Sequence, residues 1–297
     1  MISDLHTHTT ASDGRLAPAA LVAAAHAAGI GLLAITDHDT LGGIAEAAVA
    51  ARHAGIGLVA GVELSVTLTR TAPPRGHRLG GPVGSAAAAA PAPASGDVEV
   101  HLLALGVDVR DAALRDHLDA FQHVRRARAA EMVARLNDLG VPVTVAGVEA
   151  RADGGAIGRP HVAAEIVAVG AAVDVPDAFE RFLRDGGPAA APKAPFPARD
   201  AIRMVHAAGG LVVAAHPAFL PSEDALDRLV AAGIDGIEVR HPSHGWASER
   251  FFVGEALRRG LCQTGGSDYH GHRAGDDERL GRFSVAADVL PTLRRIA

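Results

Sequence analysis

Histidine and aspartate gather in four short segments of this 297-residue chain, each directly after an apolar run. The segments are Asp4-Leu5-His6-Thr7-His8, Thr36-Asp37-His38-Asp39, Ala215-His216-Pro217 and Gly266-Ser267-Asp268-Tyr269-His270. Imidazole and carboxylate groups, without thiolate, suit manganese, iron or zinc. Strand ends of an α/β barrel meet at one rim, so side chains from distant segments can share a site there. The pattern predicts a metal centre built from strand ends.

Two of these segments place ligands two residues apart. His6 and His8 would project from the same face of a strand, as residues at this spacing do, and could converge on one ion. Asp268 and His270 repeat the spacing between glycines, which allow close approach of the backbone. The alternative for each pair is a solvated strand end, so the pairs count mainly through their coincidence with the other segments.

Three further residues could complete the centre. Asp13 lies in a turn-forming stretch, where it could equally cap a loop. Glu63 ends an apolar run, where its two oxygens could serve two cations or form a buried ion pair. His101 lies inside an apolar strand, where a core histidine is the alternative. Their coincidence with the four segments favours a shared metal site.

Taken together, these motifs resemble the polymerase and histidinol phosphatase (PHP) superfamily of metal-dependent phosphoesterases, and the match covers both halves of the chain. The resemblance implies an α/β fold, a distorted (β/α)7 barrel, with three divalent ions at its rim. It implies one ion on His6, His8, Glu63 and Asp268, a second on Glu63, His101 and His216, and a third on Asp13, His38 and His270. Manganese is expected by analogy with the family, with iron and zinc left open.

Arginines could supply a phosphate clamp. Arg125 and Arg128 are three apart on a predicted helix and share a face, although a solvated helix face would look the same. Arg159 precedes a proline that could begin a helix, whose amides favour an anion. Both features resemble a PHP branch of nucleoside 3',5'-bisphosphate phosphatases and 5'-to-3' exoribonucleases. In that branch a small inserted helical domain covers the rim.

The resemblance implies hydrolysis of the 3'-phosphate of nucleoside 3',5'-bisphosphates, and related cleavage of short 5'-phosphorylated RNA, by metal-activated water. Asp37 and His244 are the candidate catalytic residues, His244 as a proton donor or phosphate contact. Asp13, His38 and His270 are expected to touch substrate as well as metal. A histidinol-phosphatase type of small-metabolite phosphatase, a non-catalytic PHP module and an amide hydrolase remain alternatives.

The elements that must position these residues alternate between strand and helix, which predicts a parallel α/β sheet. Expected strands cover 1–5, 32–35, 57–62, 211–215, 236–240 and 261–264; expected helices cover 18–28, 43–54, 121–139, 200–208, 223–232 and 248–259. Residues 1–108 and 192–297 would form the barrel, and 109–191 the inserted helical domain. The stretch 71–97, rich in Pro, Gly and Ala, predicts a surface loop or hairpin tip.

Composition limits the partners. With 48% hydrophobic residues the chain can bury a large core, and a net charge of −6 argues against long duplex nucleic acid. A small nucleotide or short single-stranded RNA is the expected partner, with no obligate protein partner. The single cysteine, Cys262, excludes an internal disulfide, and the start of the sequence lacks a leader pattern, so we expect the cytoplasm. No apolar run is long enough to predict a membrane span.

Overall fold

The computed structural model describes residues 1–69, 97–222, 224–272, 275–286, 293 and 295–296. Its centre is a mixed sheet with the strand order β1-β2-β3-β4-β5-β6-β7, and a short β8 pairs with β3. The strands are β1 (Ile2–Asp4), β2 (Ile30–Ile35), β3 (Gly57–Thr69), β4 (Asp97–Leu105), β5 (Leu211–Ala214), β6 (Gly236–Arg240), β7 (Cys262–Gly265) and β8 (Arg295–Ile296). The α/β class predicted from the alternation is confirmed.

The expectation of a wholly parallel sheet is wrong at β4. This strand runs antiparallel to both neighbours, β3 and β5, whereas the pairs β1–β2, β2–β3, β5–β6 and β6–β7 are parallel. The reason lies in β3, which continues seven positions past the predicted end at residue 62 and has its last residue, Thr69, paired with Asp97. A strand that pairs directly with its predecessor in this way reverses direction, because no helical crossover is needed.

The two edges of the sheet approach each other just beyond β1 and β7. The Leu5 amide donates to the Gly265 carbonyl at 3.2 Å, and the His8 amide donates to the Tyr269 carbonyl at 2.9 Å. These bonds bring the first and last ligand segments of the chain side by side. The complete (β/α)7 barrel stays a prediction.

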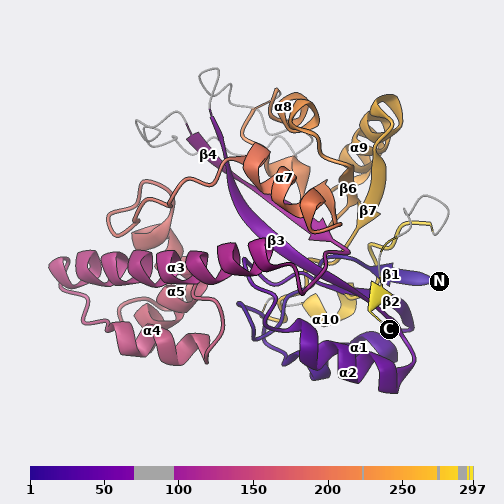
Figure 1. Ribbon diagram of the computed structural model, residues 1–297. Coiled ribbons are helices and arrows are strands. Elements are labelled where there is room, and N and C mark those ends of the chain that lie inside the picture. The colour runs from indigo at the N-terminus through magenta and orange to yellow at the C-terminus, as the bar shows by residue number, and fades with distance from the viewer. Residues whose placement is uncertain (70–96, 223, 273–274, 287–292, 294, 297) are drawn as a thin grey trace.

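Helices flank the sheet on two sides (Figure 1). On one side lie α1 (Pro18–Ala27) and α2 (Ile44–Ala54); on the other lie α7 (Ala198–Ala207), α8 (Ala225–Ala232) and α9 (Trp246–Arg259). The short α10 (Asp276–Arg279) is joined to β1 through the Gly281 amide, which donates to the Asp4 carboxylate at 2.9 Å. Glycine ends two of these helices: Gly55 and Gly260 adopt φ of 71° and 67° at the caps of α2 and α9. Glycine takes this conformation at little cost.

The middle of the chain is helical and has a hydrophobic cluster of its own. It comprises α3 (Ala112–Asp138), α4 (Val145–Ala152), α5 (Arg159–Ala168), α6 (Val175–Ala178) and the π-helical turn η1 (Phe179–Leu183), beside the sheet in Figure 1. Buried residues between 129 and 191 pack there, separately from the clusters around the sheet. The domain boundaries 1–108, 109–191 and 192–297 stay predictions.

Helix α3 is longer than predicted and joins two cores. It begins at Ala112 rather than at 121, because the Asp111 carboxylate accepts a hydrogen bond from the Leu114 amide at 2.8 Å. Its buried Leu114 and Leu118 belong to the cluster beside the sheet, whereas its later residues, from Ala129 on, belong to the helical cluster. The turns between these two sets carry Arg125 and Arg128, which therefore lie where the two cores meet.

The predicted loop at 71–97 lies outside the described residues, apart from Asp97. Among the residues that the structure describes, no helix is long and apolar enough to cross a membrane.

Candidate metal centre

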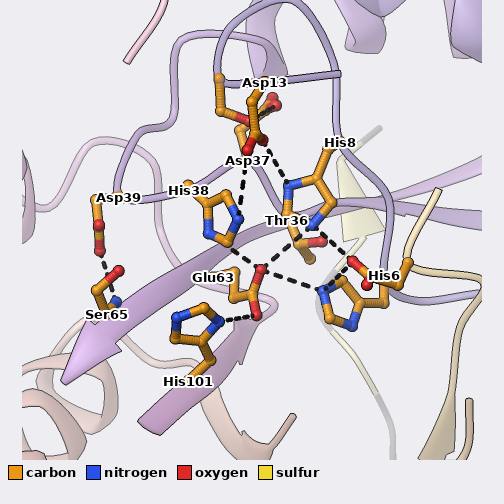
Figure 2. A network of polar contacts seen from close by, with 12 residues as sticks. His6, His8, Asp13, Thr36, Asp37, His38, Asp39, Glu63, Ser65 and His101 are labelled. Atoms are coloured by element: carbon orange, nitrogen blue, oxygen red, sulfur yellow. Dashed lines mark hydrogen bonds and ion pairs between the residues drawn. The ribbon is translucent and has the colours of Figure 1, made fainter. Parts of the chain in front are cut away.

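Glu63 lies at the middle of the predicted ligands (Figure 2). Its side chain is 1% exposed, and its backbone is fixed by the Glu63 amide donating to the Thr36 carbonyl and by the Asp39 amide donating to the Glu63 carbonyl. Five imidazoles surround the carboxylate. Oε2 lies 3.3, 3.2 and 3.1 Å from nitrogens of His6, His8 and His38, and Oε1 lies 2.8 and 3.0 Å from nitrogens of His101 and His216.

The remaining predicted ligands stand on either side of this cluster. Asp268 Oδ1 lies 3.4 Å from His6 Nε2 and 3.3 Å from His8 Nε2. Asp13 faces His38 at 3.9 Å and His270 at 3.4 Å. All nine predicted ligands are therefore brought together, although they come from segments between residues 6 and 270.

The ligand atoms fall into overlapping groups, each with its atoms within 4.8 Å of one another. One group is the predicted first set, His6, His8, Glu63 and Asp268. Another contains the predicted third set, Asp13, His38 and His270, with His8 added. A third joins Glu63 and His101 to His38, whereas the sequence prediction joined them to His216. His8 and His38 therefore stand between neighbouring groups.

The buried polar atoms of the cluster fit a cation. His6 Nε2, both ring nitrogens of His8, His38 Nδ1, Asp13 Oδ1 and Glu63 Oε2 are buried without a hydrogen-bond partner. Burying so many unsatisfied acceptors and donors would cost several kcal/mol, roughly 1–3 kcal/mol for each neutral group. Cations shared among them would satisfy their lone pairs. The residues present therefore match a mixed imidazole and carboxylate metal centre.

The charges of the cluster point the same way. Burial alone would raise the pKa of the Glu63 carboxyl, but the imidazoles around it, His101 and His6 among them, hold that pKa well below its usual value. Asp13 and Asp268 keep lowered pKa values for the same reason, despite burial. Burial, above all, lowers the pKa of His38 to about 3, so its ring is neutral at pH 7. The ionised carboxylates and the neutral ring of His38 are ready to bind metal, whereas His101 and His270, whose pKa values are raised to about 10, must first lose a proton.

Unusual backbone conformations place several of these side chains. Asp39, His216 and Asp268 have positive φ of 51°, 29° and 50°, and each follows the end of a strand. Such conformations cost energy outside glycine and are concentrated at functional sites. Gly266 contributes through its small size, because a Cβ there would lie 2.3 Å from the Cβ of His6. Only glycine therefore lets the end of β7 approach β1 this closely.

A cavity of about 240 Å³ opens over the cluster. Its lining includes ligands, among them Glu63, His101 and Asp268, called here the ligand wall, and the cationic side chains Arg125, Arg128, Arg159 and Lys193, called here the cationic wall. The three arginines predicted to bind phosphate therefore share one space with the metal ligands, although they come from the helical middle of the chain.

The arginines differ in what already holds them. Arg125 donates to the Asp39 carboxylate and, at 2.9 Å, to the Ile157 carbonyl, so it ties the helical part to the rim of the sheet. Arg128 makes one hydrogen bond with its Nε, to the Ala191 carbonyl at 3.0 Å. Burial, and then the charge of Arg159, lower the pKa of Arg128 to about 10. A cation destabilised by burial and by a like charge gains most from a bound anion.

Comparisons with known proteins agree with this geometry. The PHP domain model matches residues 4–142. A 3',5'-nucleoside bisphosphate phosphatase from Chromobacterium violaceum is 34% identical over 98% of this chain and 93% of its own length. The chain belongs to the PHP domain family. The 5'-3' exoribonuclease Rnm of Escherichia coli is 32% identical over 91% of this chain and 85% of its own length.

A solved structure shares the fold of this PHP chain. It is described as an amidohydrolase from Chromobacterium violaceum with bound sulfate and no metal, and it covers 97% of this chain and 93% of its own. The TM-score is 0.80 at 32% identity. A second solved structure, named a putative metal-dependent phosphoesterase from Bifidobacterium adolescentis, has a TM-score of 0.79 at 30% identity and covers 97% of this chain and 93% of its own. This structure and the curated relatives identify the chain as a metal-dependent hydrolase of phosphate esters.

Two residues of the PHP centre are absent from the predicted ligand set. Glu238, in β6, is fully buried and accepts hydrogen bonds from the His6 ring Nδ1 at 3.0 Å and from the His216 amide at 2.7 Å. His241 Nε2 lies 3.4 Å from Asp268 Oδ2. A charged residue inside the apolar run Gly236-Ile237-Glu238-Val239 was the available signal for Glu238. His241 follows the same strand as His244, and no local pattern distinguishes the two.

The predicted catalytic residues lie at different depths. Asp37 is fully buried and accepts hydrogen bonds from the Thr9 amide, the Thr9 hydroxyl and the Ser12 hydroxyl, at 2.7 to 2.8 Å. It therefore fixes the loop that carries Asp13. His244 bonds the Val239 carbonyl through Nδ1 at 2.9 Å and lies beside the rings of His241 and Phe252, and it is not among the residues lining the cavity. The catalytic role of both stays a prediction.

Proposed function

We propose that this PHP enzyme removes the 3'-phosphate of nucleoside 3',5'-bisphosphates, giving the 5'-monophosphate and phosphate. The observation that carries the proposal is the cavity in which a metal-ligand cluster faces Arg125, Arg128 and Arg159. A substrate with two phosphates could place one on each wall. A phosphate monoester with one anionic group would use only the ligand wall.

The cationic wall suits the 5'-phosphate as a handle. Arginine binds phosphate through parallel N–H donors, which also fixes the orientation of the ligand. Arg128 has guanidinium donors beyond its bond to Ala191, and Arg125 holds the wall in place through Asp39. A handle at this position would orient the ester for reaction, and positioning of this kind lowers the barrier substantially.

The ligand wall would hold three divalent ions, with manganese our first choice. His6, His8, Glu63 and Asp268 would hold one, Glu63, His101 and His216 a second, and Asp13, His38 and His270 a third. When bound, such ions activate water and stabilise charge on phosphate oxygens. Asp13, His38 and His270 line the cavity, so they are also placed to contact the scissile phosphate.

The chain's own residues prepare the site for this chemistry. Glu238 accepts a hydrogen bond from His6 Nδ1, which keeps the proton on that nitrogen and leaves Nε2 as the ligand atom. Asp37 fixes the loop of Asp13, which makes it a positioning residue in this proposal. Neither His244 nor His241 lines the cavity, but His241 Nε2 is 3.4 Å from Asp268 and so lies nearer the ligands, which makes His241 the better candidate donor of the proton that the leaving 3'-oxygen needs.

The names of the relatives support phosphoester substrates of this kind. They include a 3',5'-nucleoside bisphosphate phosphatase and 5'-3' exoribonucleases, and also a phosphoribosyl 1,2-cyclic phosphate 1,2-diphosphodiesterase from Eggerthella lenta. We therefore include short 5'-phosphorylated RNA, cleaved from its 5' end, as a second substrate class. A histidinol-phosphatase activity would leave the cationic wall without a ligand, which makes it the weaker alternative.

We also propose that the sheet is the distorted (β/α)7 PHP barrel and that residues 109–191 form an inserted helical domain. The hydrogen bonds that join the segments after β1 and β7 support closure of the sheet. The separate hydrophobic cluster between residues 129 and 191 supports the insertion.

A substrate panel tests the function. The protein, supplied with Mn²⁺, is assayed with adenosine 3',5'-bisphosphate, a short 5'-phosphorylated RNA and histidinol phosphate. We expect the highest kcat/KM for the bisphosphate or the RNA. A higher kcat/KM for histidinol phosphate would overturn the proposal in favour of the small-metabolite alternative.

A further inference from the structure

A second cavity, of about 190 Å³, adjoins the one over the metal ligands. His101, His216, Glu99 and Arg159 line both, so the two spaces share a boundary at the predicted second ion. The far side of the second cavity consists of Val100, Ala215, Phe219 and Leu220, with Asp185 at its edge. Its lining is thus mostly apolar beyond the boundary, in contrast to the cationic wall of the first cavity.

Phe219 gives this second cavity an aromatic wall. The residue ends the short 3-10 turn Pro217–Phe219 that directly follows His216, and its amide donates to the His216 carbonyl at 3.0 Å. Its ring centre lies 5.5 Å from that of His216, yet the side chain is 53% exposed. A single exposed aromatic residue is ordinary. One attached by a tight turn to a predicted metal ligand, and lining a cavity beside it, has a defined position relative to the reaction.

The charges of the second cavity disfavour another phosphate. Arg159, the only arginine or lysine among its described lining residues, is 2.7 Å from the Asp185 carboxylate, and Glu99 adds a second carboxylate. An uncharged planar ring suits such walls better. Bases of single-stranded nucleic acids stack on exposed aromatic side chains with little dependence on sequence.

The order of the two cavities indicates which base would stack on Phe219. Arg125 and Arg128 line the first cavity and not the second, Phe219 lines the second and not the first, and His101 and His216 stand between. A 5'-phosphate on the arginines and a scissile phosphate at the ligands place the first nucleoside in the first cavity. The chain beyond the scissile phosphate then reaches Phe219.

We propose that the Phe219 cavity binds the base of the second nucleotide of a short 5'-phosphorylated oligonucleotide, an inference that rests on the proposed function. Water adds to the scissile phosphorus, the bond to the 3'-oxygen of the first nucleotide breaks, and that oxygen takes a proton. The phosphate remains on the 5'-oxygen of the second nucleotide. That nucleotide therefore stays attached to the reacting phosphate throughout, and stacking on Phe219 positions it.

The test compares adenosine 3',5'-bisphosphate with the 5'-phosphorylated dinucleotide of adenosine, using Mn²⁺-supplied wild type, Phe219→Ala and Phe219→Trp. We expect Phe219→Ala to lower kcat/KM for the dinucleotide about 5- to 150-fold relative to the bisphosphate, as loss of one stacked base does. Phe219→Trp should retain the dinucleotide activity. Trp246→Ala, which removes an exposed aromatic side chain on α9, is the matched control and should keep the wild-type ratio.

The outcomes separate the site from the function. Equal losses on both substrates would place the first base at Phe219 and overturn the proposal, and so would an unchanged ratio in Phe219→Ala. A wild-type protein without activity on either nucleotide would refute the proposed function, and the second-nucleotide site with it. Thermal melting of each variant shows whether a lost activity reflects lost folding, in which case Phe219→Trp decides between the outcomes.

Discussion

The two walls of the active cavity are built in opposite ways. The ligand wall comes from the strands and the loops that follow them, and it is held by backbone conformation, buried carboxylates and close strand approach, as at Gly266. The cationic wall comes mainly from helices that have a separate hydrophobic cluster. Arg125, bonded to Asp39, ties the two together. Metal ligation should therefore depend on the sheet, whereas substrate choice should depend on how the helical part is placed.

The strongest test of this division removes a ligand from the sheet. We expect His216→Ala to lower kcat at least about 1000-fold, because stabilisation by bound ions contributes several kcal/mol to the transition state. Asp13→Ala should behave likewise, with little change in the melting temperature of either variant. His53→Ala, which removes an exposed histidine from α2, is the control. Wild-type turnover in His216→Ala would break the assignment of the ligand wall.

A smaller effect is expected at Glu238, which contacts two of the ligands. Glu238→Ala should weaken Mn²⁺ binding about 10- to 100-fold, because Glu238 orients His6 and anchors the His216 amide. The matched control is Glu165→Ala, which removes a buried carboxylate from the helical part that pairs with Arg151. Calorimetric titration with Mn²⁺ gives both affinities. Equal weakening by the two variants would show that metal binding is not confined to the sheet.

The cationic wall should respond through substrate binding. We expect Arg128→Ala to raise KM about 10- to 100-fold for a substrate with a 5'-phosphate, as loss of a hydrogen bond between charged groups does. The rate on a simple phosphate ester should hardly change. Arg126→Ala is the control, because Arg126 is exposed on the same helix. An equal loss on both kinds of substrate would contradict the role of this wall as a handle.

The smallest expected effect is the release of protons when metal binds. Burial alone would lower the pKa values of His101 and His270. Glu63 raises the pKa of His101, and Asp13 raises that of His270, to about 10 in each case. Both imidazoles are therefore protonated at pH 7 without metal, whereas a bound ion requires the neutral ring, so metal affinity should fall as pH falls.

Titration with Mn²⁺ in two buffers of different ionisation enthalpy measures the protons released. We expect protons to be released at pH 7 from His101, from His270 and from His6, whose pKa Glu238 and Glu63 raise well above its usual value despite burial. Glu99→Gln should reduce the number, because the Glu99 carboxylate also raises the pKa of His101. Metal binding with no proton release would mean that the imidazoles are neutral before metal arrives.

Much of the ligand set could be predicted from the sequence because its residues interrupt apolar runs. A polar or charged side chain directly after a buried strand is costly unless it has a partner, which made His6, His38 and His216 conspicuous. His101 was harder, since it lies inside its strand. The structure gives the reason: β4 is antiparallel, so its beginning, and not its end, lies at the rim.

Other features depend on contacts that no local pattern shows. Glu238 matters because two distant segments donate hydrogen bonds to it, at His6 and His216. Asp39 matters because it accepts a hydrogen bond from Arg125, which lies 86 positions later in the chain. The start of α3 was missed because the polar residues of its first turns mask the helical periodicity. Only Leu114 and Leu118 pack there, against the core beside the sheet.

The positive φ angles of Asp39, His216 and Asp268 lower the stability of the fold while they place side chains in the site. Each of these conformations costs of the order of 1–3 kcal/mol of folding free energy, and glycine would avoid most of that cost. A His216→Gly protein should therefore be inactive yet melt at a higher temperature than His216→Ala. Glycine at these points would relax the loops but would remove the side chains that Asp39, His216 and Asp268 bring to the site.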